Sequence, residues 1–345
     1  MQIKSFNINK QSPVFIIAEL SANHNGSLET ALETVRAAKR AGADCIKLQT
    51  YTAETITIDS HKEDFMLKGT IWEGKNLYDL YKEAYTPWEW HDEIMKVAEE
   101  EGLICFSSPF DPTSVDFLES LNVPAYKIAS FEITDIPLIE YVASKGKPVI
   151  ISTGIATIED IELALDACHR MGNFDIALLK CTSSYPAPIE EANMCMVKDL
   201  AERFNVITGL SDHTMGATVP VVATCFGAKI IEKHFILDRS VGGPDASFSM
   251  NEAEFSEMVK VVREAELAIG KVDYTLTEKQ QKGKDFSRSL YVVEDIKVGE
   301  IITKKNVRSI RPGFGMHPKF YYDVLGKIAK QDIDKGEPLS LTDLY

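Results

Sequence analysis

The chain has 345 residues, of which 45% are hydrophobic and 26% are charged, as in an ordinary globular protein with a sizeable core. Its formal net charge of −15 argues against a nucleic-acid surface or an anionic membrane surface, so we expect no partner of either kind. The same charge repels anions, so an anionic substrate would have to be held by local cations.

No stretch of the sequence predicts export or a membrane anchor. The N-terminus lacks the charged-then-apolar pattern of a signal peptide, and no run of about 18 apolar residues is present. The six cysteines form no CxxC pair and most lie in apolar runs, which indicates reduced thiols and a cytoplasmic location. Cys181, at a predicted strand end, is a candidate nucleophile, although no base lies near it in the sequence.

Residues 14–270 alternate between short apolar runs and amphipathic helical segments. Eight such units predict an α/β fold, a (β/α)8 TIM barrel in residues 1–270, rather than an open doubly wound sheet. No G-x-G-x-x-G turn follows a strand, which counts against a dinucleotide fold. The predicted strands are 14–19, 45–50, 103–108, 125–130, 148–153, 176–183, 206–211 and 229–235.

Polar residues stand at the C-terminal end of every predicted strand, where this fold gathers its catalytic groups. Two of these ends carry histidine, at His213 and His234, and Glu232 shares the face of His234 because strand side chains alternate. If the two strands are neighbours, two imidazoles and a carboxylate converge and suit a divalent metal with open positions. The alternative is a pair of hydrogen-bonded core histidines.

The connection formed by residues 51–86 is much longer than an ordinary βα loop and is rich in tyrosine and tryptophan. It is either a sugar-binding lid or a surface helix over residues 76–81 whose aromatic side chains pack onto the barrel.

After residue 270 the pattern changes to a polar linker, residues 271–285, and then to a small, mostly β domain, residues 286–345. This domain contains a weak repeat, in which residues 295–300 recur as residues 332–337, each ending in a tight Gly-Glu turn. Arg311, between the two copies, is either a surface charge or a group that reaches an active site.

Several segments together resemble the sialic acid synthases, and the form of residues 18–24 is most similar to the pseudaminic acid synthase branch. The tail, including Arg311-Pro312, resembles the antifreeze-like (SAF, β-clip) domain of that family. The matching segments are Glu19 with Asn23-His24-Asn25-Gly26, Lys47 with Gln49-Thr50, Ser107-Ser108-Pro109-Phe110-Asp111, Lys127 to Glu132, Ser152-Thr153-Gly154, Cys181-Thr182 with Tyr185-Pro186, Gly209 to Thr214, Glu232 to Phe235, and Gly243-Pro244-Asp245.

The resemblance implies a transferase that condenses phosphoenolpyruvate with an acetamido-deoxy hexose and releases phosphate. In the pseudaminic acid branch this sugar is 2,4-diacetamido-2,4,6-trideoxy-L-altrose. Glu19 matches the general base, and His213 and His234 match ligands of a Mn²⁺-type ion, with Mg²⁺ and Co²⁺ as alternatives. Positions for phosphoenolpyruvate are Lys47, Ser108, Lys127, Ser130, Ser152, Ser183, Ser211 and Glu232, and positions for the sugar are Tyr185, Asp245, Arg311 and Asn76.

Two further implications concern assembly and a departure from the family pattern. Arg311 would come from the partner's SAF domain, so the resemblance implies a domain-swapped homodimer with each SAF domain over the other barrel. Ser183 stands where the family often has asparagine, a side chain of longer reach.

Four other functions remain open on the sequence. The first is an N-acetylneuraminate or legionaminic acid synthase, and the second is another synthase of 3-deoxy sugar acids acting on a phosphorylated sugar. The third is a class II metal-dependent aldolase, and the last is a catalytically idle sugar-binding protein.

Overall fold

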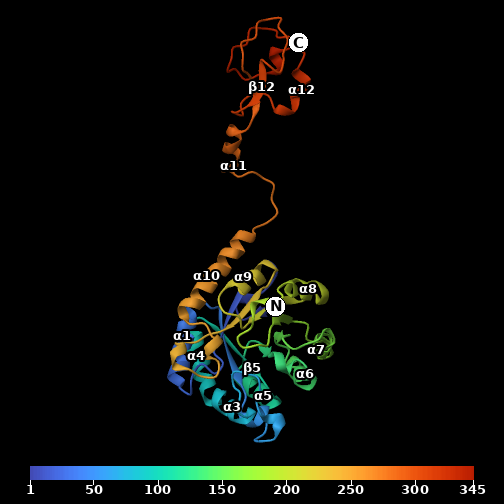
Figure 1. The fold of residues 1–345 in the computed structure, drawn as a ribbon. Coiled ribbons are helices and arrows are strands. Elements are labelled where there is room, and N and C mark those ends of the chain that lie inside the picture. The colour runs from blue at the N-terminus through green and yellow to red at the C-terminus, as the bar shows by residue number, and fades with distance from the viewer. The chain divides into compact units, whose positions relative to one another are not determined.

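Eight parallel strands close into a barrel, as the sequence predicts, in the computed structural model, which describes all residues 1–345. The chain divides into two units, Met1–Gly270 and Lys271–Tyr345, and the barrel belongs to the first (Figure 1). The strands follow one another round the barrel in chain order, and β10 closes it against β3. They are β3 (Phe15–Glu19), β4 (Cys45–Thr50), β5 (Ile104–Pro109), β6 (Tyr126–Ile128), β7 (Val149–Ser152), β8 (Ile176–Cys181), β9 (Ile207–Asp212) and β10 (Ile230–His234).

A ring of helices covers the outer face of the barrel. Each strand is followed by one main helix, and Ser27 caps the first of them by accepting a hydrogen bond from the Thr30 amide. The helices are α1 (Leu28–Arg40), α4 (His91–Glu100), α5 (Pro112–Ser120), α6 (Ile136–Ala143), α7 (Ile158–Arg170), α8 (Cys195–Phe204), α9 (Thr218–Cys225) and α10 (Glu252–Ile269). No helix is both long and apolar enough to cross a membrane.

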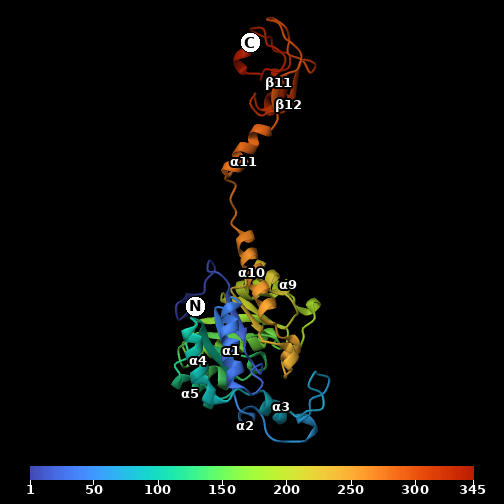
Figure 2. The ribbon, with the colours of Figure 1, turned by 90° about the vertical axis from the view of Figure 1, so that its left-hand side faces the viewer.

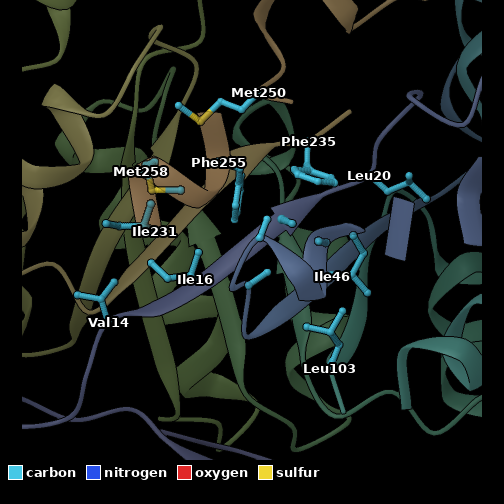
Figure 3. Packing of buried hydrophobic residues seen from close by; sticks show 14 of the residues in the cluster. Val14, Ile16, Leu20, Ile46, Leu103, Ile231, Phe235, Met250, Phe255 and Met258 are labelled. Atoms are coloured by element: carbon cyan, nitrogen blue, oxygen red, sulfur yellow. The ribbon is translucent and has the colours of Figure 1, made fainter. Parts of the chain in front are cut away.

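Alternation along the strands separates an outer core from an inner one. In Figure 2, α1 lies between α4 and α10 on the outside of the barrel. Outward-facing Ile16 and Ile231 pack with Phe255 and Met258 of α10 in Figure 3, where the rings of Phe235 and Phe255 meet edge to face. The inner core is also apolar, and is formed by Phe15, Ile17, Cys45, Ile104, Phe106, Ala125, Ile150, Ala177, Leu179 and Ile230.

An N-terminal hairpin, absent from the sequence-based prediction, covers one end of the barrel. Strands β1 (Gln2–Ile3) and β2 (Phe6–Asn7) pair antiparallel, and Ile3 and Ile8 are buried in the inner core. The ring of Phe6 lies 4.8 Å from that of Phe15. The inner core is therefore closed at the end where the strands begin, which leaves their C-terminal ends for a site.

The second unit contains the antiparallel strands β11 (Ser289–Val292) and β12 (Val307–Ile310) and its own apolar core. The repeated segments pair with each other through Ile296 and Ile333, so the weak sequence repeat corresponds to two facing halves. Within the segment predicted as linker, residues 278–283 form the short helix α11 (Glu278–Gly283).

An ion pair on the outer face of β9 and β10 fixes their register. Asp212 and Lys233 are directly opposite in the ladder, and their side chains, 2% and 1% exposed, approach to 2.6 Å. The Asp212 carboxylate also accepts hydrogen bonds from the amide and hydroxyl of Thr214, and Lys233 donates to the Thr214 carbonyl. This pair therefore holds the turn on which His213 stands.

We expect Lys233→Met to lower the free energy of unfolding of the barrel by about 3–5 kcal/mol, because it leaves the Asp212 carboxylate buried without its cation. The double variant with Asp212→Asn should recover part of this loss, since Asn keeps hydrogen bonds to Thr214. All three tryptophans lie in the barrel unit, so urea unfolding followed by tryptophan fluorescence reports on it alone. A loss below about 1 kcal/mol, the value for a solvent-exposed ion pair, would contradict this prediction.

Candidate active site

A cavity of about 440 Å³ opens at the C-terminal ends of the strands. Its volume is within the usual range for a small-molecule site. Twelve of the fifteen residues that the sequence nominates line it: Glu19, Lys47, Lys127, Ser130, Ser152, Ser183, Tyr185, Ser211, His213, Glu232, His234 and Asp245.

Strand alternation brings these side chains together. In β10, Ile230 belongs to the inner core and Glu232 and His234 follow it on the same face, while Lys233 points outward. The same step of two residues leads from Cys45 to Lys47 in β4. The inward positions therefore change from apolar to charged within one layer of side chains.

Buried charges of opposite sign meet at the floor of the cavity. The Nζ of Lys47 lies 3.0 Å from Oε1 of Glu19 and 3.1 Å from Oε1 of Glu232. Burial opposes the charge of Lys47, but the two carboxylates outweigh it and raise the pKa of Lys47. Burial likewise opposes the charge of Glu19, yet Lys47 and His234 hold the pKa of Glu19 well below its usual range. Glu19 is therefore ionised at neutral pH.

A second buried lysine stands beside this cluster. The Nζ of Lys127 donates to Oγ of Ser152 at 2.6 Å and to the Ile128 carbonyl, and lies 3.8 Å from Oε1 of Glu232. Burial lowers the pKa of Lys127 because its carboxylate neighbour is more distant. Ser211 donates to the same Glu232 oxygen at 2.9 Å. A bound anion would therefore stabilise the charged form of Lys127.

The two imidazoles converge, with ring centroids 5.3 Å apart. Nδ1 of His213 lies 3.1 Å from the Thr182 carbonyl, an acceptor only, so Nδ1 carries the proton and Nε2 keeps its lone pair. His234 has Nε2 3.4 Å from Oε2 of Glu19, and its buried Nδ1 has no hydrogen-bond partner. The second ring is thus not a satisfied core histidine. Imidazoles and carboxylates are the kinds of donor that divalent transition metals bind, but no group of three or more His, Cys, Asp or Glu side chains is arranged to hold a metal ion by itself.

Ser130 and Ser183 line another side of the cavity, and their hydroxyls lie close to the backbone of Gly154. The amide of Gly154 donates to Oγ of Ser130 at 3.1 Å. A Cβ at Gly154 would lie 2.1 Å from Oγ of Ser183 and 2.7 Å from Oγ of Ser130, so only glycine fits there. The hydroxyls of Ser130 and Ser183 therefore both lie next to Gly154, despite the short side chain of Ser183.

Cys181 lies beside His213, a neighbour that sequence spacing concealed. Its Sγ lies 3.9 Å from Nδ1 of His213. Burial opposes the thiolate, but His213 lowers the pKa of Cys181 to about 7. All six cysteines are free; four are buried, whereas Cys195 and Cys225 are exposed.

Three nominated residues do not line the cavity. The side chain of Asn76 caps helix α3 (Leu77–Ala84) by accepting a hydrogen bond from the Asp79 amide at 2.7 Å, and its contact with the sugar stays a prediction. Ser108 is fully buried, and its hydroxyl has no hydrogen-bond partner. Arg311 belongs to the second unit.

The sequence-based prediction missed several lining residues. Glu132 is half-buried, and one of its carboxylate oxygens is buried without a hydrogen-bond partner; burial raises the pKa of Glu132 to about 7. Gln49 donates to Oε1 of Glu19 at 2.7 Å. Gln49 lies at the end of a predicted strand and Glu132 just after another, which was the available signal, but burial of a carboxylate is decided by contacts from other elements.

The segment after β4 lies against the cavity. It contains helix α3, where the sequence predicted either a sugar-binding lid or a surface helix over residues 76–81. Residues 66–76 fold back as a hairpin, with Met66 bridged to Asn76. The Trp72 indole donates to the Pro244 carbonyl at 2.9 Å, and its ring lies 5.7 Å from that of Tyr185. Helix α3 adds Leu77, Leu80, Tyr81 and Ala84 to the lining.

We expect Glu132 to make stability depend on pH. Its folded-state pKa is raised from 4.5 to about 7, so its contribution is fully present below about pH 4.5 and is lost as the pH rises through about 7. Between pH 5 and 8, wild type should therefore lose on the order of 1–2 kcal/mol relative to Glu132→Gln. If the free energy of unfolding changed equally with pH in wild type and Glu132→Gln, the raised pKa of Glu132 would be contradicted.

Comparison with known proteins agrees with the fold. The NeuB family model matches residues 34–274, and the SAF domain model matches residues 287–344. The chain is 50% identical to the pseudaminic acid synthase of Campylobacter jejuni strain 81-176, over 99% of both chains. It is 47% identical to that of Helicobacter pylori strain 26695, over 96% of this chain and 98% of the relative.

A solved structure supports the same conclusion. The N-acetylneuraminic acid synthetase of Leptospira borgpetersenii, crystallised with citrate, superposes with a TM-score of 0.74 at 29% identity, over 82% of this chain and 94% of that one. With its closed barrel followed by a SAF domain, the chain belongs to the NeuB family.

Proposed function

We propose that the chain is a pseudaminic acid synthase, a transferase that condenses phosphoenolpyruvate with 2,4-diacetamido-2,4,6-trideoxy-L-altrose and water to give pseudaminic acid and phosphate. The near full-length identity of 47–50% to proteins with that activity supports this choice of sugar. The observation that carries the chemistry is that Lys47, Lys127, Glu19 and both histidines surround one cavity.

Phosphoenolpyruvate would occupy the floor of the barrel. It carries a phosphate and a carboxylate, which require cations and hydrogen-bond donors. Lys47 and Lys127 supply the charge, and the neighbouring serines supply hydroxyl donors: Ser130, Ser152, Ser183 and Ser211. Ser108, in β5, retains a buried hydroxyl without a hydrogen-bond partner, and Glu232 orients both lysines through Oε1.

The charge balance of the floor supports a divalent metal. The two ammonium groups are cancelled by the carboxylates of Glu19 and Glu232, so a substrate with several negative charges needs further positive charge. His213 and His234 would hold the ion, Mn²⁺ by preference, with Mg²⁺ or Co²⁺ as alternatives. When bound there, a divalent ion acts as a Lewis acid that polarises the sugar aldehyde for attack by C3 of phosphoenolpyruvate.

Glu19 would act as the general base. Attack by C3 turns the aldehyde oxygen into an alkoxide and leaves positive charge at C2. Water adds to C2 while Glu19 takes one of its protons, and this proton would then be passed to the alkoxide. The new C2 hydroxyl loses its proton as the C–O bond to phosphate breaks, which gives the 2-keto group and hydrogen phosphate. Its lowered pKa keeps Glu19 ionised, and Gln49 and Lys47 hold Oε1 while Oε2 faces His234. Tyr185 and Asp245 would contact the sugar; Asp245 is fixed by a 2.5 Å hydrogen bond from Ser21.

We also propose that the enzyme works in the cytoplasm as a domain-swapped homodimer in which the partner's SAF domain brings Arg311 to the sugar. Six free cysteines favour a reducing compartment.

The test is release of inorganic phosphate from phosphoenolpyruvate, measured with Mn²⁺-loaded protein and defined sugars. We expect turnover with the diacetamido-trideoxy sugar. Turnover only with a sugar phosphate would favour a different 3-deoxy sugar acid synthase, and release of phosphate with no sugar would contradict the proposal. Absence of any phosphate release would favour an aldolase or an idle binding protein.

We expect His234→Ala to lower kcat by at least about 10³-fold, with little change in unfolding temperature, because it removes a metal ligand at the rim rather than core volume. Mn²⁺ titrated into stripped variant should bind at least tenfold more weakly than to wild type. His169→Ala, a change on α7, serves as the control. Wild-type Mn²⁺ affinity in the variant would rule out the proposed ligand set.

We expect Arg311→Ala to raise the KM for the sugar by about tenfold or more while leaving the KM for phosphoenolpyruvate within about twofold, since a lost charged hydrogen bond is worth roughly 1.5–3 kcal/mol. Arg308→Ala, in strand β12, which ends one residue before Arg311, is the control. An unchanged sugar KM would assign the second unit a structural role only.

A further inference from the structure

The cavity has two chemically different ends. Its floor is charged, whereas one wall comes from the segment between β4 and α4 and is largely apolar. This wall, called here the 51–84 wall, consists of Tyr51, Ile56, Leu67, Thr70, Trp72, Leu77, Leu80, Tyr81 and Ala84.

The 51–84 wall offers few hydrogen-bonding groups. Its tryptophan N–H already donates to the Pro244 carbonyl. Tyr51 packs edge to face against Tyr81 and Phe110, and burial raises the pKa of both Tyr51 and Tyr81, so their hydroxyls stay neutral donors. Ile56, Leu67 and Leu77 are only half-buried although they line the cavity. Apolar surface is therefore left for a ligand to cover.

No cation belongs to the 51–84 wall. The lining of the cavity contains only two cationic side chains, Lys47 and Lys127, and both lie at the floor among carboxylates. A phosphoryl group placed against the wall would lose its hydration without gaining a positively charged partner from the barrel, which is strongly unfavourable.

The direction of the sugar follows from the chemistry of the floor. The proposed function, on which this step rests, requires the aldehyde carbon C1 beside Glu19, His213 and His234. Carbons C4 to C6 form the other end of the sugar chain and must extend from the floor towards the segments that cover it. Of the segments that follow strands, the one after β4 contributes the most residues to the lining, and these residues form the 51–84 wall.

We infer that the 51–84 wall is the specificity determinant of the enzyme: it receives the C6 methyl and the 4-acetamido group and selects an unphosphorylated 6-deoxy sugar. The methyl groups cover Ile56, Leu67 and Leu77, while the hydroxyls of Tyr51 and Tyr81 donate to the amide carbonyl. A 6-hydroxyl would lie against apolar side chains with its hydrogen bonds unmade.

The experiment uses a pair of sugars that differ by one oxygen: 2,4-diacetamido-2,4,6-trideoxy-L-altrose and its 6-hydroxy counterpart. We expect wild type to prefer the 6-deoxy sugar by about 10- to 200-fold in kcat/KM, the range for one such group in an apolar pocket. The 6-phosphate of the hydroxy sugar should give no turnover. Equal kcat/KM for the two sugars, or turnover of the 6-phosphate, would overturn the inference.

Two variants on separate elements test the wall itself. Ile56→Gln, on α2 (Ala53–Ile56), and Leu77→Gln, on α3, should each reduce the 6-deoxy preference by about tenfold, because the amide can pair with the 6-hydroxyl. Ile58→Gln is the matched control: Ile58 is 62% exposed, lies on the same segment and does not line the cavity. An unchanged preference in both Gln variants, with phosphoenolpyruvate affinity intact, would contradict the assignment.

Failure of the inference and failure of the proposed function are distinguishable. If wild type releases phosphate with neither diacetamido sugar, the proposed function is wrong. If it releases phosphate with both at equal efficiency, the function stands and the wall does not select at C6. Binding of phosphoenolpyruvate, followed by tryptophan fluorescence, checks independently that each variant retains the folded floor.

Discussion

The rest of the site depends on the ion cluster at the floor of the barrel, in which Lys47 lies between Glu19 and Glu232. Buried ions are costly unless each is paired, and a single shared ammonium joins strands β3, β4 and β10 through its two carboxylates. Gln49 and Ser211 satisfy further lone pairs. The cluster fixes the general-base candidate. Its charges cancel only when the neighbouring Lys127 is included, so additional positive charge is required for an anionic substrate.

The register of strands β9 and β10, fixed by an ion pair on their outer face, sets the positions of the polar groups inside the barrel. The outward ion pair of Asp212 and Lys233 is interleaved with the inward residues Ser211, Glu232 and His234 along two adjacent strands. A shift of one residue in this register would exchange the two sets and bury the metal-ligand candidates in the helical layer. Stability and positioning are therefore supplied by the same ladder of residue pairs.

Function in this family member is divided between a floor and a wall that come from different kinds of structure. The floor is built from strand ends, which are rigid and place polar atoms within hydrogen-bond distance. The wall is built from a long connection that can vary in sequence without disturbing the barrel. Such a division allows one condensation chemistry to be combined with different sugars.

Much of the fold and the floor could be predicted from the sequence because their signals are local. Apolar runs at regular intervals specify eight strands, and a step of two residues places Lys47, Glu232 and His234 inward without reference to any other segment. Seven of the twelve nominated residues that line the cavity lie on strands and are placed in this way, and the other five lie in the connections that follow strands. The chemical roles of all twelve rested on resemblance to a family.

Only the tertiary structure decided which polar groups are paired and which are left open. The thiol of Cys181 beside His213 and the unpartnered carboxylate oxygen of Glu132 both depend on residues distant in the chain or on burial by other elements. The apolar character of the 51–84 wall likewise appears only when α2, the hairpin and α3 are folded against one cavity. Periodicity fixes the direction of a side chain within its own strand, whereas its surroundings are set by packing between segments, which no local pattern encodes.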